Sequence, residues 1–299
     1  MISVIMSVYN TPDDWLSQSI QSVLDQSYRE FEFLIIDDNT SSSNKAVLNF
    51  YREKDFRIHI LTNDHNEGLT KSLNKALAAA NGDFIARIDS DDVAQPQRFE
   101  KQLEQFMANE NLVLCGTWAT TLNDYKKGSC KTPIGTSDFL KINLLFGNIF
   151  IHSSVMIRAS ILKKNNLMYD EKFKFAQDFE FWSRLAQYGD LQNIDETLCL
   201  YRIHDKQIST KQLEQQNSYR DEIVQENLAK IGMNISKQNI SRYINVIHAK
   251  GEKEKLWWIL ACSFKTIIAL FRHYGMKAFS TNKYILGNSV WMIKKSIWG

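Results

Sequence analysis

The sequence IDSDD, which ends at Asp92, carries the residues best suited to chemistry. It closes an apolar run of strand length, DFIARID (83–89). Asp89 and Asp91 stand one residue apart, and two carboxylates at a strand end can bind a hard divalent cation such as Mn²⁺ or Mg²⁺. Such a cation can hold a diphosphate and neutralise the charge that builds on it as it departs. In a plainer interpretation, Ser90 or Asp92 only caps the helix that follows.

The first hundred residues predict the elements that position these carboxylates. Four β-rich apolar runs, ISVIMSVY, FEFLIIDD, RIHIL and DFIARID, alternate with helical patterns. This alternation predicts a doubly wound, mostly parallel α/β sheet. Ligands bind such sheets beyond the carboxyl ends of the strands. Tyr9, Asp38 and the carboxylates of IDSDD all fall at such ends.

The remaining chain has a different pattern. Strands are expected at LVLCGTWAT and SSVMIR, and a helix that begins near Ala176 places Trp182 at the spacing of core residues. After about residue 210 the chain becomes polar and helical, and then basic and aromatic. We therefore expect a catalytic domain over 1–210, followed by a C-terminal α-helical, basic-aromatic segment over 211–299.

Charge is divided unevenly between these two parts. Residues 1–210 carry 22 Lys+Arg and 28 Asp+Glu, a net of −6, and residues 211–299 carry 14 and 6, a net of +8, which together give the +2 of the chain. The basic part favours an anionic surface. Four scattered cysteines without metal-ligand spacing predict reduced thiols and a cytoplasmic location. We expect no secretory signal and no membrane span.

Several ordered segments resemble family 2 glycosyltransferases of the bacterial surface-glycan type, which have the GT-A fold. The similar segments are SVIMSVYN, LIIDDNTSS, NEGLTKSLNKAL, IDSDD with the following P-x-RF, HSSVMIR, AQDFEFWSRL and YRIHDKQIS. The resemblance covers about residues 2–210 and implies a nucleotide-sugar-binding half (1–100) and an acceptor-binding half (101–210). Two departures are mild: Asn-Thr replaces the Gly-Ser of the usual D-D-G-S, and Gln177 replaces a usual Glu.

The resemblance implies donor-binding roles for four residues. Asp38 would hydrogen-bond the base of the nucleotide, with Tyr9 at the same pocket. Asp89 and Asp91 would hold the ribose, the diphosphate and the metal ion. Lys71 is a candidate for a nucleotide contact, although a lysine on an exposed helix face is the simpler explanation.

Two further residues gain roles in the same way. Asp178 would be the general base that deprotonates the acceptor hydroxyl, and His204 would complete the metal or diphosphate site. Taken alone, Asp178 is better explained as a charge favoured by a helix N-terminus, and His204 as an ordinary surface or core histidine. Trp182 could stack on an acceptor sugar but fits a core position better, and His152 is similarly ambiguous.

The function implied by the resemblance is that of an inverting, metal-dependent, non-processive glycosyltransferase. It would move a hexose or N-acetylhexosamine from a nucleotide sugar, with UDP favoured, to a hydroxyl of a glycan or lipid-linked acceptor. The product would be a surface polysaccharide such as an O-antigen, capsule or lipopolysaccharide. The chain has no Arg-Trp pair, which disfavours a processive synthase. The alternatives are a nucleotidyltransferase and a non-catalytic nucleotide-sugar-binding subunit.

The C-terminal segment has two interpretations. Four of the seven tryptophans lie in the last 43 residues, among lysines. This composition suits a helix on an anionic bilayer surface, which would place the protein peripherally on the inner face of the cytoplasmic membrane. It suits equally a cap that packs on the catalytic domain or on another subunit, so a homo-oligomer stays open. No nucleic-acid-binding module accompanies it, so no nucleic acid is expected as a partner.

Overall fold

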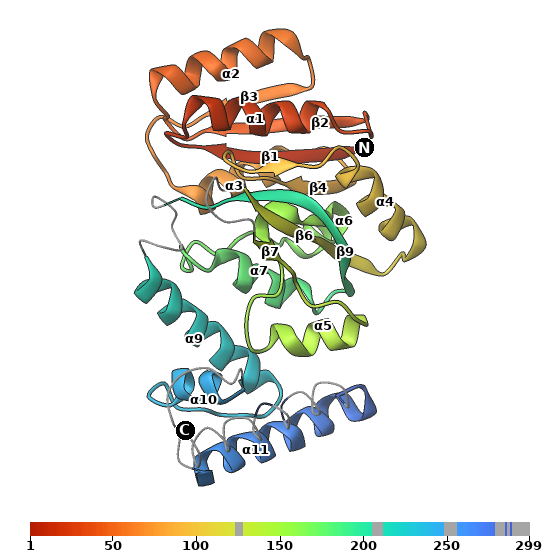
Figure 1. The fold of residues 1–299 in the computed structure, drawn as a ribbon, viewed down its shortest axis with the longest axis vertical. Coiled ribbons are helices and arrows are strands. Elements are labelled where there is room, and N and C mark those ends of the chain that lie inside the picture. The colour runs from red at the N-terminus through yellow and green to blue at the C-terminus, as the bar shows by residue number, and fades with distance from the viewer. Residues whose placement is uncertain (123–127, 205–211, 248–255, 279–284, 286–287, 289–299) are drawn as a thin grey trace. The chain divides into compact units, whose positions relative to one another are not determined.

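The chain forms two compact units in its computed structural model (Figure 1). The model describes residues 1–122, 128–204, 212–247, 256–278, 285 and 288. The first unit comprises residues 1–134 and 150–211, and the second comprises 135–149 and 212–299. The second unit thus includes a short segment, 135–149, that the sequence pattern did not separate from the preceding residues.

Among the described residues, the first unit is built on a nine-stranded sheet with the order β3-β2-β1-β4-β8-β6-β9-β5, in which β7 pairs with β6. The strands are β1 (Ile2–Val8), β2 (Phe31–Asp37), β3 (Ile58–Thr62), β4 (Phe84–Arg87), β5 (Val93–Ala94), β6 (Leu112–Leu122), β7 (Ser129–Cys130), β8 (Met156–Arg158) and β9 (Asp190–Arg202). The first four in chain order are parallel, and β9 is parallel to β6. The predicted α/β fold is confirmed. Antiparallel β8 joins the N-terminal parallel strands to β6.

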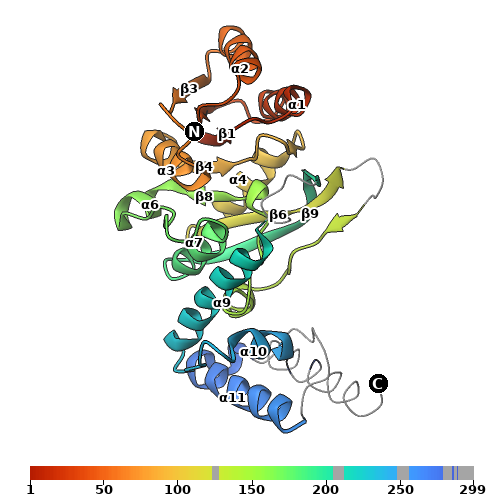
Figure 2. The same ribbon diagram turned by 90° about the vertical axis from the view of Figure 1, so that its left-hand side faces the viewer.

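Helices cover both faces of this sheet: α3, α6 and α7 lie on one face, and α1 and α4 on the other (Figure 2). The helices of the first unit are α1 (Asp13–Leu24), α2 (Ser42–Lys54), α3 (Leu69–Ala79), α4 (Arg98–Ala108), α6 (Ala159–Asn165), α7 (Gln177–Leu185) and the 3₁₀ turn η1 (His152–Ser154). Strands β1 and β2 are almost wholly buried because helices pack on both of their faces. On α1, Leu16, Ile20 and Val23 repeat at helical spacing and are fully buried.

Strand β9 was not predicted from the sequence. Its register with β6 shifts near Trp118, and exposed polar residues at 195–197 interrupt its alternation. A bulged strand lacks the regular two-residue period by which strands are recognised. The strand matters for the site because its end carries Arg202 and leads into His204.

The described part of the second unit is helical, as predicted. It consists of α5 (Ser137–Leu144), α9 (Leu213–Lys230), α10 (Ile240–Ile247), α11 (Leu256–Tyr274) and the 3₁₀ turn η2 (Gly275–Ala278). The hydroxyls of Tyr243 on α10 and Thr266 on α11 form a buried hydrogen bond between the two helices. Within the described ranges, a helix that combines the length and the hydropathy needed to span a bilayer is absent.

A buried carboxylate on β2 joins three segments of the first unit. Glu32 accepts hydrogen bonds from Ser3 Oγ at 2.5 Å and from the Asn81 backbone N–H at 2.7 Å. Gly82 N–H donates to the same Ser3 Oγ, and a Cβ at Gly82 would lie 2.5 Å from Ser3 N, so this approach requires glycine. Burial alone would raise the pKa of Glu32, but the hydrogen bonds from Ser3 and Asn81 outweigh it and lower the pKa.

Replacement of Glu32 tests the contribution of these hydrogen bonds to stability. Because the folded pKa is lowered, the stabilisation is present above the unfolded pKa of about 4.3 and is lost as the pH falls through the folded value. We expect Glu32→Gln to lower the unfolding free energy by about 1–3 kcal/mol at neutral pH. The difference from wild type should shrink below about pH 4. Urea unfolding at several pH values measures it, with the exposed Glu30→Gln as control. A pH-independent difference would contradict the assignment.

Candidate active site

The carboxyl ends of the parallel strands bring Tyr9, Asp38 and Asp89 to one edge of the sheet. Tyr9 follows β1, Asp38 follows β2 and Asp89 lies two residues beyond β4, and these strands are neighbours. The backbone N–H of Asp38 donates to Val8 O at 3.0 Å, which ties the first two strand ends together. Tyr9 is 52% exposed, whereas Asp38 is 1% exposed.

The Asp38 carboxylate is engaged in the protein's own hydrogen bonds. It accepts from Asn63 Nδ2 at 2.8 Å and from the backbone N–H groups of Glu67 at 2.8 Å and Gly68 at 2.9 Å. Gly68 has a φ of 87° and is the N-cap residue of α3. Asp38 therefore anchors the loop that starts α3, and the predicted contact between its carboxylate and a base stays a prediction.

Three carboxylates form the centre of the site. One oxygen each of Asp89, Asp91 and Asp92 lies within 4.8 Å of the other two. The side chains of Asp89 and Asp91 are 31% and 24% exposed, and Asp92 is fully buried. The capping interpretation is wrong, because α4 begins at Arg98 with Gln97 at its N-cap.

Asp89 is held by a buried arginine from its own strand. Arg87 Nη1 donates to Asp89 Oδ2 at 2.6 Å, and Arg87 Nη2 donates to Oδ1. The Arg87 guanidinium is 2% exposed. Burial alone would lower the pKa of Arg87, but Asp89 and the phenol of Tyr169 outweigh it and raise the pKa. The bidentate pair fixes the direction in which Asp89 presents its carboxylate.

Two later segments complete the surroundings of Asp92. Strand β8 is antiparallel to β4, so the turn that precedes it lies at the carboxyl end of β4 and brings in Ser153. Ser153 Oγ donates to Asp92 Oδ2 and, alternatively, to Asp89 Oδ2 at 2.8 Å. The end of β9 passes on the other side, where the backbone N–H of Arg202 donates to Asp92 Oδ1 at 2.8 Å.

His204 lies beside Asp91. Its Nε2 is 2.8 Å from Asp91 Oδ2. The ring also packs on Trp15 of α1, with 5.2 Å between the ring centroids, and the Arg202 guanidinium lies 4.6 Å from the centroid of the same indole. Trp15 thus supports the segment that carries His204.

The electrostatics of the cluster favour a bound cation. Burial, together with repulsion from Asp89, raises the pKa of Asp91, although His204 partly offsets this. The pKa of Asp92 is raised well above its ordinary value by burial and by the charges of Asp89 and Asp91. A divalent cation would relieve this repulsion, and three carboxylates with an adjacent imidazole suit Mn²⁺ or Mg²⁺. The donor set therefore fits the metal that the resemblance implies.

Asp178 and Asp89 both act electrostatically on one buried tyrosine, Tyr169. Asp178 is the second residue of α7 and is half-buried, with its Oδ1 accepting from Phe179 N–H at 2.8 Å. Burial raises the pKa of Tyr169, and the charges of Asp178 and Asp89 raise it further. Both carboxylates are thus within electrostatic reach of one phenol. The Tyr169 hydroxyl, kept protonated, can donate to His152 Nε2 at 2.9 Å.

His152 and Trp182 belong to the packed interior around this phenol. Burial lowers the pKa of His152 well below its ordinary value, which keeps the ring neutral. Trp182 is fully buried and packs against Tyr169 and Phe181. The expectation of a core tryptophan is confirmed, and stacking of Trp182 on a sugar is excluded by its burial.

Lys71 stands apart from the cluster. It lies on α3, its side chain is 51% exposed, and its Nζ is 4.0 Å from Glu171 Oε2, which is exposed as well. This agrees with a lysine on an exposed helix face. A contact between Lys71 and a nucleotide is not tested by this arrangement and stays a prediction.

The sequence reasoning missed Arg87, Ser153, Arg202 and Trp15 as parts of the site. Three of them stand in segments that had been singled out, ARIDSDD, HSSVMIR and YRIH. A charged residue inside an apolar strand pattern, as at Arg87, was an available signal, because an arginine is rarely buried without a partner. For Trp15 we find no local signal that separates it from a core residue.

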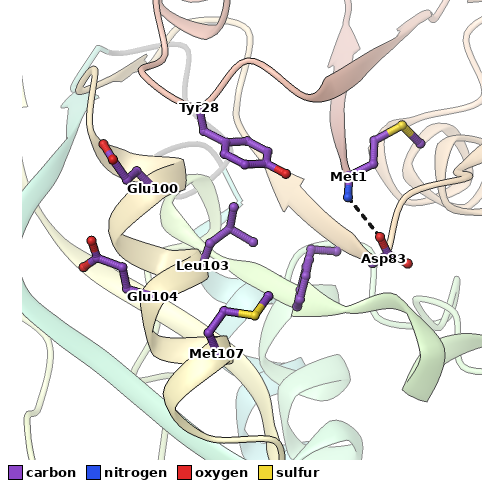
Figure 3. Close-up of a pocket in the computed structure, with 8 residues that line it drawn as sticks. Met1, Tyr28, Asp83, Glu100, Leu103, Glu104 and Met107 are labelled. Atoms are coloured by element: carbon purple, nitrogen blue, oxygen red, sulfur yellow. Dashed lines mark hydrogen bonds and ion pairs between the residues drawn. The ribbon is translucent and has the colours of Figure 1, made fainter.

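A separate surface hollow of about 640 Å³ lies at the opposite edge of the sheet (Figure 3). It is lined by residues at the amino ends of β1 and β4, in the segment before β2 and along α4: Met1, Tyr28, Asp83, Phe84, Glu100, Leu103, Glu104 and Met107. The Met1 amino group bonds Asp83 beside it. None of the predicted site residues lines it, so it does not compete with the acidic cluster as the active site.

Metal binding can be tested by thermal unfolding. A cation that binds only the folded protein stabilises it by about 2.7 kcal/mol at 100 times its Kd. We expect Mn²⁺ to raise the Tm of the wild type by several degrees and to leave that of Asp91→Asn unchanged. The exposed Asp64→Asn, which lies outside the cluster, should respond as the wild type does. An undiminished rise in Asp91→Asn would remove Asp91 from the metal site.

The ion pair between Arg87 and Asp89 can be tested by replacing the arginine. Arg87→Met leaves the half-buried Asp89 without a counter-charge, and we expect the unfolding free energy to fall by about 2–4 kcal/mol. Arg87→Lys should recover part of this loss, since it keeps the charge but not the two parallel hydrogen bonds. Urea unfolding measures both, and the exposed Arg52→Met serves as control. Equal stability of Arg87→Met and wild type would show that the pair is dispensable.

Comparison of the sequence with known proteins gives a consistent result. The model of "Glycosyl transferase family 2" matches residues 3–165. An uncharacterized glycosyltransferase of Haemophilus influenzae is 29% identical over 87% of this chain and 84% of its own length. The O-antigen biosynthesis glycosyltransferase WbnJ of Escherichia coli is 34% identical over 69% and 81%. The Escherichia coli protein WfgD, named a UDP-Glc:alpha-D-GlcNAc-diphosphoundecaprenol beta-1,3-glucosyltransferase, is 29% identical over 77% and 89%.

Solved structures share the fold at low identity. S. aureus TarS residues 1–349 in complex with UDP superposes with a TM-score of 0.61 at 16% identity, over 98% of this chain and 90% of that one. The mannosyltransferase PcManGT of Pyrobaculum calidifontis, in complex with GDP-Man and Mn²⁺, gives 0.59 at 12%, over 99% and 87%. With the family model spanning more than half of the sequence and the GT-A sheet beneath the acidic cluster, this chain belongs to glycosyl transferase family 2 and is a glycosyltransferase.

Proposed function

We propose that the protein transfers a hexose or N-acetylhexosamine from a UDP-sugar to a hydroxyl of a glycan or lipid-linked acceptor during surface-polysaccharide assembly. The reaction is metal-dependent, inverts the anomeric carbon and adds one sugar at a time. The observation that carries the proposal is the clustering of Asp89, Asp91 and His204 at the carboxyl edge of the sheet. The names of WbnJ and WfgD support the class of acceptor.

The donor side is assigned to the carboxyl edge. Asp91 and His204, which lie side by side, would hold the metal ion, and Asp89, fixed by Arg87, would contact the ribose and the diphosphate. When bound, Mn²⁺ or Mg²⁺ supplies Lewis-acid neutralisation of the diphosphate that leaves. UDP is the proposed nucleotide because TarS was solved with UDP and because an Asp38 carboxylate can accept an N–H of uracil. The Asp38 carboxylate is buried and bonded to the backbone of Gly68, so the loop that ends at Gly68 must rearrange before a donor base can reach it.

The acceptor side is assigned to Asp178. The proton of the acceptor hydroxyl passes to the Asp178 carboxylate as the hydroxyl oxygen attacks the anomeric carbon. The bond to the diphosphate oxygen breaks on the opposite face of the sugar, so a single displacement inverts the configuration. The position of Asp178 at the start of α7, near the same phenol as Asp89, supports this role. Tyr169 and His152 form the rigid packing beneath it.

The decisive experiment is a panel of nucleotide sugars assayed with and without Mn²⁺. We expect release of UDP from one UDP-sugar, dependent on metal and accelerated by a glycan acceptor. Asp91→Asn should lose this activity. Release of pyrophosphate from a nucleoside triphosphate and a sugar phosphate would instead indicate a nucleotidyltransferase. Binding of a donor without turnover of any acceptor would indicate a non-catalytic subunit.

Removal of the proposed base separates binding from chemistry. Asp178→Asn should lower kcat by about 10²–10⁴-fold, the usual contribution of a general base. Its Kd for the donor, measured by calorimetry with Mn²⁺ present, should stay near the wild-type value. The exposed Asp195→Asn on β9 is the matched control and should retain full activity. A kcat that survives in Asp178→Asn would assign the proton transfer to another residue.

A further inference from the structure

Helix α11 of the second unit is apolar on two faces. One face is buried, where α11 lies beside α10 (Figure 2). Its buried residues repeat at helical spacing: Ile259, Cys262, Ser263, Thr266, Ala269 and Leu270. This face accounts for the packing of α11 within its own unit.

The other face of α11 carries large apolar side chains in solvent. Leu260, Phe264 and Phe271 are 51%, 66% and 54% exposed. Their spacing of four and seven residues places them in one stripe along the helix. A surface helix normally carries polar residues on its solvent face, and a continuous exposed apolar stripe marks an interaction site.

Within α11 itself, basic residues accompany the stripe and acidic residues are absent, although Asp138 of α5 lies within electrostatic reach of Tyr274 at the end of the helix. Lys265 and Arg272, both exposed, stand next to Phe264 and Phe271 in the sequence and follow the stripe along the helix. From residue 255 to the end, the chain has seven Lys+Arg and no Asp or Glu. A partner for this face must therefore accept apolar side chains and be negatively charged.

We propose that this α11 face, defined by Leu260, Phe264, Phe271, Lys265 and Arg272, binds an anionic lipid bilayer surface. The leucine and phenylalanines enter the boundary between headgroups and acyl chains, and the two cations contact the acidic headgroups. A second copy of the chain fits less well, because self-association would bring two basic surfaces together. A nucleic acid would satisfy the cations but leave the aliphatic part of the stripe without a partner.

The test is sedimentation of the full chain with vesicles, without donor or acceptor, so its outcome is independent of the proposed activity. We expect binding to phosphatidylcholine vesicles that contain phosphatidylglycerol, weak binding to phosphatidylcholine alone, and a loss of binding at high salt. The triple variant Leu260→Ser, Phe264→Ser, Phe271→Ser should bind at least about tenfold more weakly. Phe56→Ser, at a phenylalanine that is 89% exposed in the first unit, is the matched control.

Charge removal gives a second variant that does not risk the fold. Lys265→Gln with Arg272→Gln should weaken binding by about thirtyfold, since each cation contributes about a fivefold step near an anionic surface. The exposed Arg52→Gln with Lys237→Gln is the control pair and should bind as wild type does. Vesicle binding unchanged in both α11 variants would overturn the proposal. A shift from dimer to monomer in the triple variant, without any vesicle binding by wild type, would assign the face to a second copy instead.

Discussion

Repulsion among three carboxylates in four consecutive residues is the constraint around which the first unit is arranged. Each carboxylate meets a different partner: Asp89 is held by the Arg87 guanidinium, Asp91 by the His204 imidazole, and Asp92 by Ser153 Oγ and a backbone N–H. These partners come from β4, from the turn before β8 and from the end of β9. Burial, and after it the repulsion among the carboxylates, raises the pKa values of Asp91 and Asp92, and a divalent cation would relieve this repulsion.

The mixed parallel and antiparallel topology of the sheet brings these partners to the three carboxylates. Parallel strands deliver their carboxyl ends to one edge, which explains Tyr9, Asp38 and Asp89. A further parallel strand beside β4 would reach that edge only with the residues at its carboxyl end. Antiparallel β8 instead begins at that edge, and η1 comes directly before it in the chain. The bulged strand β9 pairs with β5, which follows the acidic cluster in the sequence. Residues 64 and 113 positions further along the chain thereby reach Asp89 and Asp91.

Side chains to which we assign chemical roles also make structural contacts. Asp38 anchors the loop before α3, Asp178 accepts the N–H of its helical neighbour, and Trp15 packs beneath His204 while it belongs to α1. This double use explains why a structural interpretation of Asp178 was reasonable, because its contact at the start of α7 is present. It also means that loss of activity in a variant of these residues has to be separated from loss of folding. The helices of the second unit bury their apolar faces as those of the first unit do, but the surface of the second unit is basic.

The spacing of apolar residues in the sequence was sufficient to predict the parallel strands β1 to β4, their helices and the positions of Tyr9, Asp38 and the aspartates. Buried strands and amphipathic helices repeat apolar residues at a regular spacing, and this spacing can be recognised in the sequence alone. Motif resemblance extended this to Asp178 and His204. Arg87 was detectable as a charged residue inside an apolar strand, but the hydrogen bonds of Ser153 and the packing of Trp15 against His204 could not be read from the sequence. They depend on the register of an antiparallel strand and on a bulge in β9, and register is decided by contacts between residues far apart in sequence. Tertiary packing also grouped residues 135–149 with the C-terminal helices and exposed one face of α11, since burial is a property of neighbours and not of residue type.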